Sequence, residues 1–190
     1  MRVISGEARG RPLRAPRNQA RTRPMADKIR EAAFSSMESL GVYPERVLDL
    51  YAGSGAVGIE ALSRGATSAV FVDRDRIACQ TIRRNLSDTG FEDRGRVVQT
   101  PVEKVLGAMR EEFDLIVIDP PYADEDILEK IEVIDDSGAA GTGTILLLGH
   151  WPRLDVPDSV GNFQALRRRC HGDSCFAIFE WVAPESRGES

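Results

Sequence analysis

Short apolar runs alternate with amphipathic segments along most of this chain. Runs of strand length and composition occur at 46–51, 69–73, 96–100, 113–119, 144–148, 162–168 and 175–181. Apolar residues at helical spacing predict helices at 55–63, 74–89, 102–109 and 125–135. This alternation predicts an α/β fold, with a mainly parallel sheet and helices on both faces. The short turn at Gly172-Asp173 joins the last two strands as a hairpin, so the C-terminal strand should be reversed.

The first forty residues have a different pattern. Residues 2–5 and 12–15 flank a glycine-bounded stretch at 6–10, which predicts a small hairpin. Pro24 then opens a predicted helix over 25–39, and Gly41 ends it. We therefore divide the chain into a small N-terminal hairpin-and-helix extension (1–40), an α/β domain (41–183) and a frayed tail (184–190).

Composition places the chain among ordinary globular proteins. Its 190 residues are 42% hydrophobic and 29% charged, and no apolar run is long enough to span a bilayer. The N-terminus has no signal-peptide pattern, and three cysteines form a sparse, odd set, so we expect a cytoplasmic protein without membrane contact. The segment 170–175 lacks the four ligands of a zinc site, so we expect no metal there. We expect instead a hairpin turn flanked by two cysteines that act as small apolar side chains.

Positive charge is concentrated at the N-terminus. Residues 1–30 carry a net charge of +7, whereas the whole chain carries −5, so the remainder is acidic. This asymmetry favours contact with a polyanion at one end, and the alternative is a solvated tail. Arginine suits phosphate recognition, and the candidates for RNA contact are Arg9, Arg11, Arg14, Arg21, Arg23 and Arg30. For Arg30 a structural role within the protein is the alternative.

A glycine-rich turn follows the first strand of the domain. Gly53, Gly55 and Gly58 match the dinucleotide fingerprint, and Asp73 lies 20 residues after Gly53, which keeps an NAD-dependent oxidoreductase open as a rival class. Asp49, however, lies four residues before Gly53. Its carboxylate would repel a pyrophosphate and suits a cofactor with a cationic amino group, such as S-adenosylmethionine.

Further cofactor contacts are expected at the ends of the neighbouring strands. Asp73 should accept hydrogen bonds from both ribose hydroxyls; it could instead cap the helix that follows it, and the two roles are compatible. Arg74 should lie against the adenine, whose edge Thr100 and Val102 should border through backbone N–H groups. Tyr51, where the first strand enters the glycine turn, completes the predicted set.

The tetrapeptide Asp119-Pro120-Pro121-Tyr122 follows a buried apolar strand. Its carboxylate can accept a hydrogen bond from an amino group, and carbonyls beside proline are free to point at a ligand. The tyrosine ring can stack on a base. A cofactor site and an amine site in one sheet predict group transfer to that amine, with these four residues as the catalytic set.

Four blocks in order, at 23–34, 47–66, 71–75 and 119–122, resemble the bacterial 16S rRNA (guanine(966)-N(2))-methyltransferase family. The resemblance implies a seven-stranded, Rossmann-like class I methyltransferase fold, S-adenosylmethionine as donor, and methylation of a guanine 2-amino group in 16S rRNA. It makes 41–183 the catalytic domain and 16S rRNA or the assembling 30S subunit the partner; we expect a monomer. Two departures occur, at Met25-Ala26 and at Gly149, where the family commonly has Thr-Thr and a Glu-containing run.

Other interpretations remain open. A methyltransferase of this type could act on adenine N6 of DNA or RNA, or on a protein glutamine amide. Glutamine enzymes usually carry Asn where Asp119 stands, and the basic N-terminus favours a nucleic acid. A non-catalytic RNA-binding module with the same fold is a further alternative.

Overall fold

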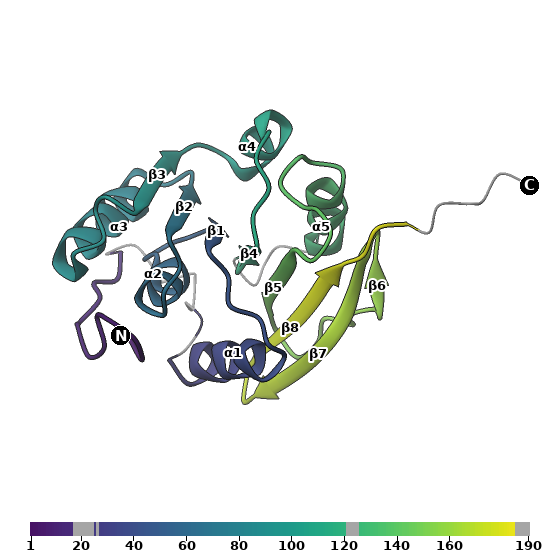
Figure 1. Cartoon of the computed structure of the whole chain (residues 1–190), viewed down its shortest axis with the longest axis horizontal. Helices are drawn as coiled ribbons and strands as arrows, with labels where there is room; N and C mark the ends of the chain where they lie inside the picture. Colours follow the sequence, from purple (N-terminus) through teal and green to yellow (C-terminus); the bar gives the residue numbers. More distant parts are fainter. Residues whose placement is uncertain (17–24, 26, 121–125, 185–190) are drawn as a thin grey trace, which may run out of the picture.

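The computed structural model describes residues 1–16, 25, 27–120 and 126–184. One eight-stranded sheet has the order β3-β2-β1-β4-β5-β8-β7-β6 (Figure 1). Its strands are β1 (Arg46–Leu50), β2 (Ser68–Asp73), β3 (Gly95–Gln99), β4 (Leu115–Ile118), β5 (Ile145–His150), β6 (Ser159–Val160), β7 (Phe163–His171) and β8 (Ser174–Trp181). Its helices are α1 (Asp27–Ser39), α2 (Ala56–Ser63), α3 (Arg76–Thr89), α4 (Val102–Ala108) and α5 (Ile127–Asp135).

The predicted Rossmann-like fold is confirmed. Strands β1 to β5 are parallel, while β8 is antiparallel to both β5 and β7 and lies between them, so the C-terminal strand is reversed as expected. The sheet has eight strands rather than seven because the two-residue β6 pairs with β7. A strand of that length leaves no alternation that a sequence pattern could reveal.

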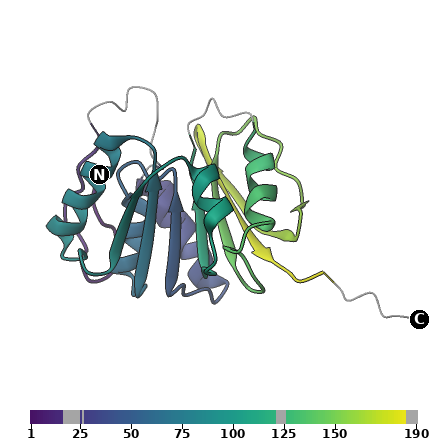
Figure 2. The same ribbon diagram turned by 90° about the horizontal axis from the view of Figure 1, so that it is seen from above.

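The two faces of the sheet carry separate cores. Side chains alternate along each strand, so Val47 and Leu115 enter one core while Leu48 and Ile116 enter the other. Helices α1, α2 and α3 cover the first face, and α4 and α5 cover the second (Figures 1 and 2). Both faces of the parallel strands are thus buried, so a ligand can reach polar groups of the sheet mainly at the strand ends.

The predicted N-terminal hairpin is present and packs on the α2 and α3 side of the sheet (Figure 1). Val3 N–H donates to the Arg11 carbonyl at 3.0 Å, which holds the two arms together. The fully buried Glu60 of α2 accepts hydrogen bonds from the N–H groups of Ile4, at 2.8 Å, and Ser5, at 3.0 Å. The hairpin shares its core with the domain that follows.

Arg30 is a correction to the predicted RNA-binding set. Its side chain is fully buried on α1, and Nη2 donates to the Arg2 carbonyl at 2.6 Å and to Asp27 at 3.1 Å. Its Nε lies 3.7 Å from Glu60 Oε2. A guanidinium held among these groups cannot reach a phosphate at the surface. Arg30 therefore ties the hairpin to α1 and α2, which is the structural role that the sequence left open for it.

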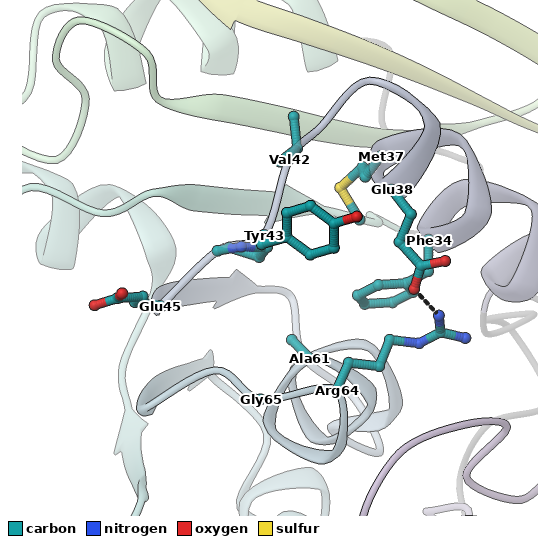
Figure 3. Close-up of a pocket in the computed structure, with 10 residues that line it drawn as sticks. Phe34, Met37, Glu38, Val42, Tyr43, Glu45, Ala61, Arg64 and Gly65 are labelled. Atoms are coloured by element: carbon teal, nitrogen blue, oxygen red, sulfur yellow. Dashed lines mark hydrogen bonds and ion pairs between the residues drawn. The ribbon is translucent and has the colours of Figure 1, made fainter.

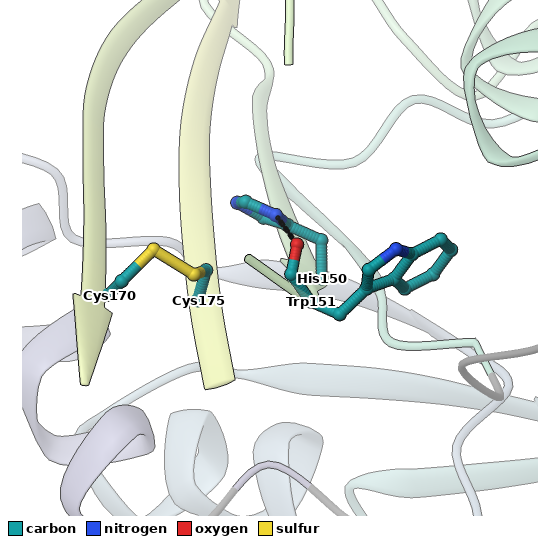
Figure 4. The surroundings of a disulfide bond; sticks show 4 residues. All are labelled: His150, Trp151, Cys170 and Cys175. Carbon is teal, nitrogen blue, oxygen red and sulfur yellow. Dashed lines mark hydrogen bonds between the residues drawn. A yellow bond between two sulfur atoms is a disulfide. The ribbon is translucent and has the colours of Figure 1, made fainter. Parts of the chain in front are cut away.

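The last hairpin also differs from expectation. Cys170 and Cys175 form a disulfide beside His150 and Trp151 (Figure 4), in place of the two separate apolar side chains that the sequence predicts. The turn at Gly172 places the two cysteines directly opposite each other on β7 and β8, with Cα atoms 4.0 Å apart. In the part of the chain that the structure describes, no helix has the length and apolar character needed to cross a bilayer.

Candidate active site

The glycine-rich turn connects the end of β1 to the start of α2. Tyr51, Gly53 and Gly55 have φ angles of 58°, 55° and 75°, in the left-handed region that glycine enters without strain. Gly55 N–H donates to the Ala52 carbonyl at 2.6 Å, which closes the turn. The turn leaves the amino end of α2, a site that favours negative or polar ligand groups, at the strand ends.

Asp49 lies under this turn, on the β1 face that looks toward α2. Its side chain is 2% exposed and accepts a hydrogen bond from Gly58 N–H at 3.0 Å. Gly58 is required here, because a Cβ would collide with the Phe71 ring and lie 3.1 Å from the carboxylate. Burial raises the pKa of Asp49 to about 8, although the Gly58 bond lowers it, and the charges of Asp119 and Asp73 raise it further. A cation beside this carboxylate would be strongly favoured.

Asp73 ends β2 and faces the glycine turn. Its Oδ2 accepts from Gly53 N–H at 2.9 Å, and its Oδ1 accepts from Asp75 N–H at 2.8 Å. The residue that caps α3 is Asp75, which accepts from Ile77 N–H at 2.9 Å, so the alternative prediction of Asp73 as the helix cap is wrong. Asp73 instead fixes the position of the turn.

The other predicted cofactor residues surround the same strand ends. Arg74 is exposed after β2, and Val102 is buried at the first position of α4. Thr100 N–H, predicted to face the adenine, already donates to the Asp73 carbonyl at 3.1 Å. Tyr51 lies on the α4 and α5 side, where its hydroxyl is 3.5 Å from Glu103.

Asp119 directly follows β4, on the same sheet face as Asp49. Its Oδ2 accepts a hydrogen bond from Met25 N–H at 3.0 Å, so the segment before α1 reaches the candidate catalytic carboxylate. Burial raises the pKa of Asp119 to about 6, and the Met25 bond opposes that rise. Pro120 is buried behind it, whereas the predicted Pro121 and Tyr122 lie outside the described residues.

The roles of three residues at this site were not predicted, although the sequence marked Met25 and Gly149 as departures from the family pattern. Met25 acts through its backbone, which leaves no side-chain signal. Gly149 on β5 leaves room for Asp119, since a Cβ there would overlap the carboxylate. Asn85, buried on α3, donates to the Ser54 carbonyl of the glycine turn at 2.8 Å, and a polar residue on the buried face of an amphipathic helix is the signal that could have revealed it.

Two of the predicted RNA-contact arginines of the hairpin, Arg11 and Arg14, contact α3. Arg9, Arg11 and Arg14 are all exposed. Arg11 Nη1 donates to the Asp88 carbonyl at 2.8 Å, and Arg14 Nε lies 2.9 Å from the Asp88 carboxylate. These are surface contacts of low strength, so both guanidinium groups could exchange them for phosphate. Arg21 and Arg23 lie outside the described residues.

A separate hollow of about 250 Å³ lies near the start of β1, at the opposite edge of the sheet (Figure 3). It is lined by residues from the last turns of α1 and α2, where Phe34, Met37 and Ala61 are buried, and by the exposed Tyr43 (Figure 3). No predicted site residue contributes to its described lining, and its charged Arg64 is paired with Glu38 at 2.6 Å. The hollow therefore belongs to packing between the helices and not to the candidate active site.

The described groups suit a nucleotide-like, cationic cofactor. Asp49 can balance a positive charge, the turn at 53–55 leaves space for a close approach, and Asp73 presents a carboxylate at the neighbouring strand end. Asp119 stands at the next strand along, where an amine could be held. Crevices at the carboxyl ends of parallel strands are the usual ligand sites in open α/β sheets.

Known proteins resemble this chain over almost its whole length. A family model described as "Conserved hypothetical protein 95" matches residues 1–180. YlbH of Bacillus subtilis (strain 168), named as a candidate rRNA methyltransferase, is 36% identical over 185 residues, which cover 95% of this chain and 98% of that protein. Ribosomal RNA small subunit methyltransferase D of Escherichia coli (strain K12) is 28% identical over 190 residues, which cover 100% of this chain and 93% of that protein.

Solved structures give the same picture. The structure of yhhF from Escherichia coli, described as a candidate methyltransferase, superposes with a TM-score of 0.82 at 29% identity and covers 97% of this chain and 99% of that chain. A hypothetical protein of Thermus thermophilus superposes with a TM-score of 0.80 at 33% identity, covering 95% of this chain and 99% of that chain. The similarity thus includes the N-terminal hairpin as well as the sheet.

Proposed function

Because the chain belongs to the family described as Conserved hypothetical protein 95, whose relatives include rRNA methyltransferases, we propose that it methylates the 2-amino group of a guanine in 16S rRNA. It is a methyltransferase of the class I fold, and S-adenosylmethionine is its methyl donor. The observation that carries the finer proposal is Asp119, a carboxylate at the end of a buried strand, held by Met25 N–H on the same sheet face as Asp49.

The proposed cofactor site uses the groups at the ends of β1, β2 and β3. Asp49 balances the cationic amino group, the Gly53–Gly55 turn allows close approach of the backbone, and Asp73 accepts hydrogen bonds from the ribose. Tyr51, Arg74, Thr100 and Val102 complete the surroundings of this site at the same strand ends. In this arrangement the carboxylates position the donor and take no part in bond making.

The proposed amine site is centred on Asp119. Its carboxylate and the Pro120 carbonyl would each accept one N–H of the exocyclic amine, which orients the nitrogen lone pair and favours positive charge on nitrogen as the methyl group arrives. The nitrogen–carbon bond forms as the sulfur–carbon bond breaks, and the surplus N–H proton leaves to solvent. Pro121 and Tyr122 complete the motif, with Tyr122 stacked on a base that has left its helix.

The proposed RNA contacts are the exposed arginines of the hairpin. Arg11 and Arg14 contact Asp88 on α3, Arg9 is exposed on the same hairpin, and Arg21 and Arg23 follow them in the sequence. Each phosphate contact that is lost should lower the salt dependence of RNA binding by about one unit. We propose a monomer that acts in the cytoplasm on 16S rRNA or on the assembling 30S subunit.

The test is direct labelling. Purified protein is incubated with tritiated S-adenosylmethionine and 30S subunits or 16S rRNA from a strain that lacks the endogenous activity, and the RNA digest is mapped for 2-methylguanosine. Label at a single guanine supports the proposal, and the Asp119→Ala variant should give none. Label in 6-methyladenosine or on a protein glutamine would overturn the guanine assignment in favour of another amine.

A further inference from the structure

One buried side chain joins the glycine turn to the basic hairpin. Asn85 on α3 is fully buried, and its amide uses both of its ends. Its Oδ1 accepts from Arg14 N–H at 2.9 Å, while its Nδ2 donates to the Arg14 carbonyl at 3.0 Å and to the Ser54 carbonyl at 2.8 Å. The amide therefore makes two hydrogen bonds with the backbone of Arg14, one as acceptor and one as donor. Its nitrogen also donates a hydrogen bond to Ser54.

These two partners belong to the two proposed binding sites. Ser54 stands between Gly53, whose N–H contacts Asp73, and Gly55, whose left-handed conformation completes the turn. Arg14 lies on the hairpin arm that presents exposed guanidinium groups to solvent. A shift of the turn on cofactor binding would therefore reach the hairpin backbone through a single buried amide.

Other anchors of the hairpin have different partners. Glu60 and Ser63 on α2 hold the backbone of residues 4, 5 and 8, and these bonds do not extend to the glycine turn. Met1 Sδ lies 3.8 Å from Ser54 Oγ, which is a weak contact. Among the described residues, Asn85 is the side chain whose strong hydrogen bonds reach both the turn and the arginine-bearing arm.

We propose that Asn85 is a positioning residue that couples cofactor binding to RNA binding. This inference rests on the proposed function, since it takes the turn as the cofactor site and the hairpin as the RNA site. Ordering of the turn by the cofactor holds Asn85, and Asn85 then holds Arg14 and its neighbours in the RNA-binding arrangement. Such coupling is reciprocal, so each ligand must tighten the binding of the other by the same factor.

The experiment measures that factor. Dissociation constants of S-adenosylhomocysteine are measured by calorimetry with and without in vitro transcribed 16S rRNA, and those of the RNA are measured with and without S-adenosylhomocysteine. For the wild-type protein we expect each ligand to tighten the other about tenfold, within the usual range of coupling between sites. For Asn85→Ala we expect the factor to fall to about one, whatever happens to the separate affinities.

Two further variants separate coupling from general damage. Thr89→Val lies one turn later on α3, where the hydroxyl donates only to the helix carbonyls of Asn85 and Leu86, so the coupling factor should stay unchanged. Arg14→Pro removes the N–H that Asn85 Oδ1 accepts and leaves the core of α3 intact, so it should lower the factor even if Asn85→Ala folds poorly.

The outcomes are distinct from those of the proposed function. A wild-type protein that methylates 16S rRNA but binds the two ligands independently overturns the coupling and leaves the function standing. A factor that persists in both Asn85→Ala and Arg14→Pro overturns the role of Asn85. A protein that binds neither 16S rRNA nor 30S subunits overturns both proposals.

Discussion

The carboxylate of Asp119 lies over the Cα of Gly149, in the space that a Cβ on residue 149 would fill. The two residues come from the adjacent parallel strands β4 and β5, whose ends meet at the candidate active site. Residue 149 departs from the family pattern, and the space of its missing side chain is filled by the carboxylate of Asp119, which belongs to the motif that this chain shares with the family. Because Gly149 has no side chain, the Asp119 carboxylate at the end of β4 can lie against the backbone of β5.

Gly149→Ala should therefore damage catalysis more than folding. The new methyl group would displace the Asp119 carboxylate by about 1 Å, and a misplacement of about 1 Å costs roughly 100-fold in turnover. S-adenosylhomocysteine affinity, measured by calorimetry, should change little because Asp49 and the glycine turn are untouched. Gly107→Ala is the matched control, since nothing lies within 4 Å of a Cβ there and its turnover should match the wild type. Equal turnover of both variants would contradict the proposed geometry.

Activity should depend on pH through Asp119. The carboxylate must be ionised to accept N–H groups from the amine, and its pKa is raised to about 6. With saturating cofactor, kcat/KM for RNA should fall about tenfold per unit below that pH and level off above it. Asp119→Asn should be far less active and should lose this inflection. A wild-type profile that stays flat between pH 5 and 7 would show that ionisation of Asp119 is not required.

Cofactor affinity should depend on pH through Asp49. Its pKa is raised to about 8 in the free protein, so binding of a cationic group requires loss of a proton from most molecules at pH 6. S-adenosylhomocysteine, which keeps the amino group, should bind more tightly as pH rises, by up to about tenfold per unit between pH 6 and 8. Calorimetry on Asp49→Asn should give weaker and pH-independent binding. Asp88→Asn, a surface change, should retain the wild-type slope.

The stability of the ligand-free protein should fall as pH rises, whereas the cofactor affinity should increase. The pKa values of Asp49 and Asp119 are raised in the folded state from 3.8 to about 8 and about 6, so the folded state holds protons that the unfolded state has released. The free energy of unfolding should therefore fall as pH rises from 5 to 8. Urea unfolding should show that Asp49→Asn loses most of this fall. Parallel curves for the variant and the wild type would contradict burial of an ionisable Asp49.

Reduction of the Cys170–Cys175 disulfide should have a modest cost. The bond closes a loop with a sequence separation of 5, and restriction of so short a loop in the unfolded chain is worth about 2 kcal/mol. Urea unfolding with and without a thiol reductant should differ by that amount for the wild-type protein. Cys170→Ser changes an exposed side chain and should abolish the response to the reductant. A response that persists in this variant would have to come from elsewhere in the chain.

Periodicity was sufficient for most of the fold, because parallel strands buried on both faces are short apolar runs with helices between them. The same rule located Asp49, Asp73 and Asp119, since side chains at the ends of parallel strands converge. What could not be predicted depends on contacts between distant segments. Arg30 is buried because Glu60, thirty residues later, faces it, and its charge alone indicated the surface.

Other features depend on which strands are neighbours and on how their residues pair, which the sequence pattern does not show. The cysteines of the last hairpin join because the turn at Gly172 places them opposite each other, and a shift by one residue would separate them. The role of Gly149 required knowledge of which strand lies beside β4. The backbone contact of Met25 with Asp119 has no sequence signature, because any residue other than proline supplies the same N–H.

The position of β8 between β5 and β7 has a consequence for the order of synthesis. β5 carries Gly149 at the active-site edge, yet one of its two neighbours is the last strand of the sheet to leave the ribosome. The N-terminal hairpin, made first, must likewise wait for Glu60 and Asn85 before it can dock. Both ends of the chain thus close on its middle, and a chain still in synthesis lacks a complete sheet. The sheet around the candidate active site is therefore complete only after β8 has been made, so the earlier strands cannot form the whole site by themselves.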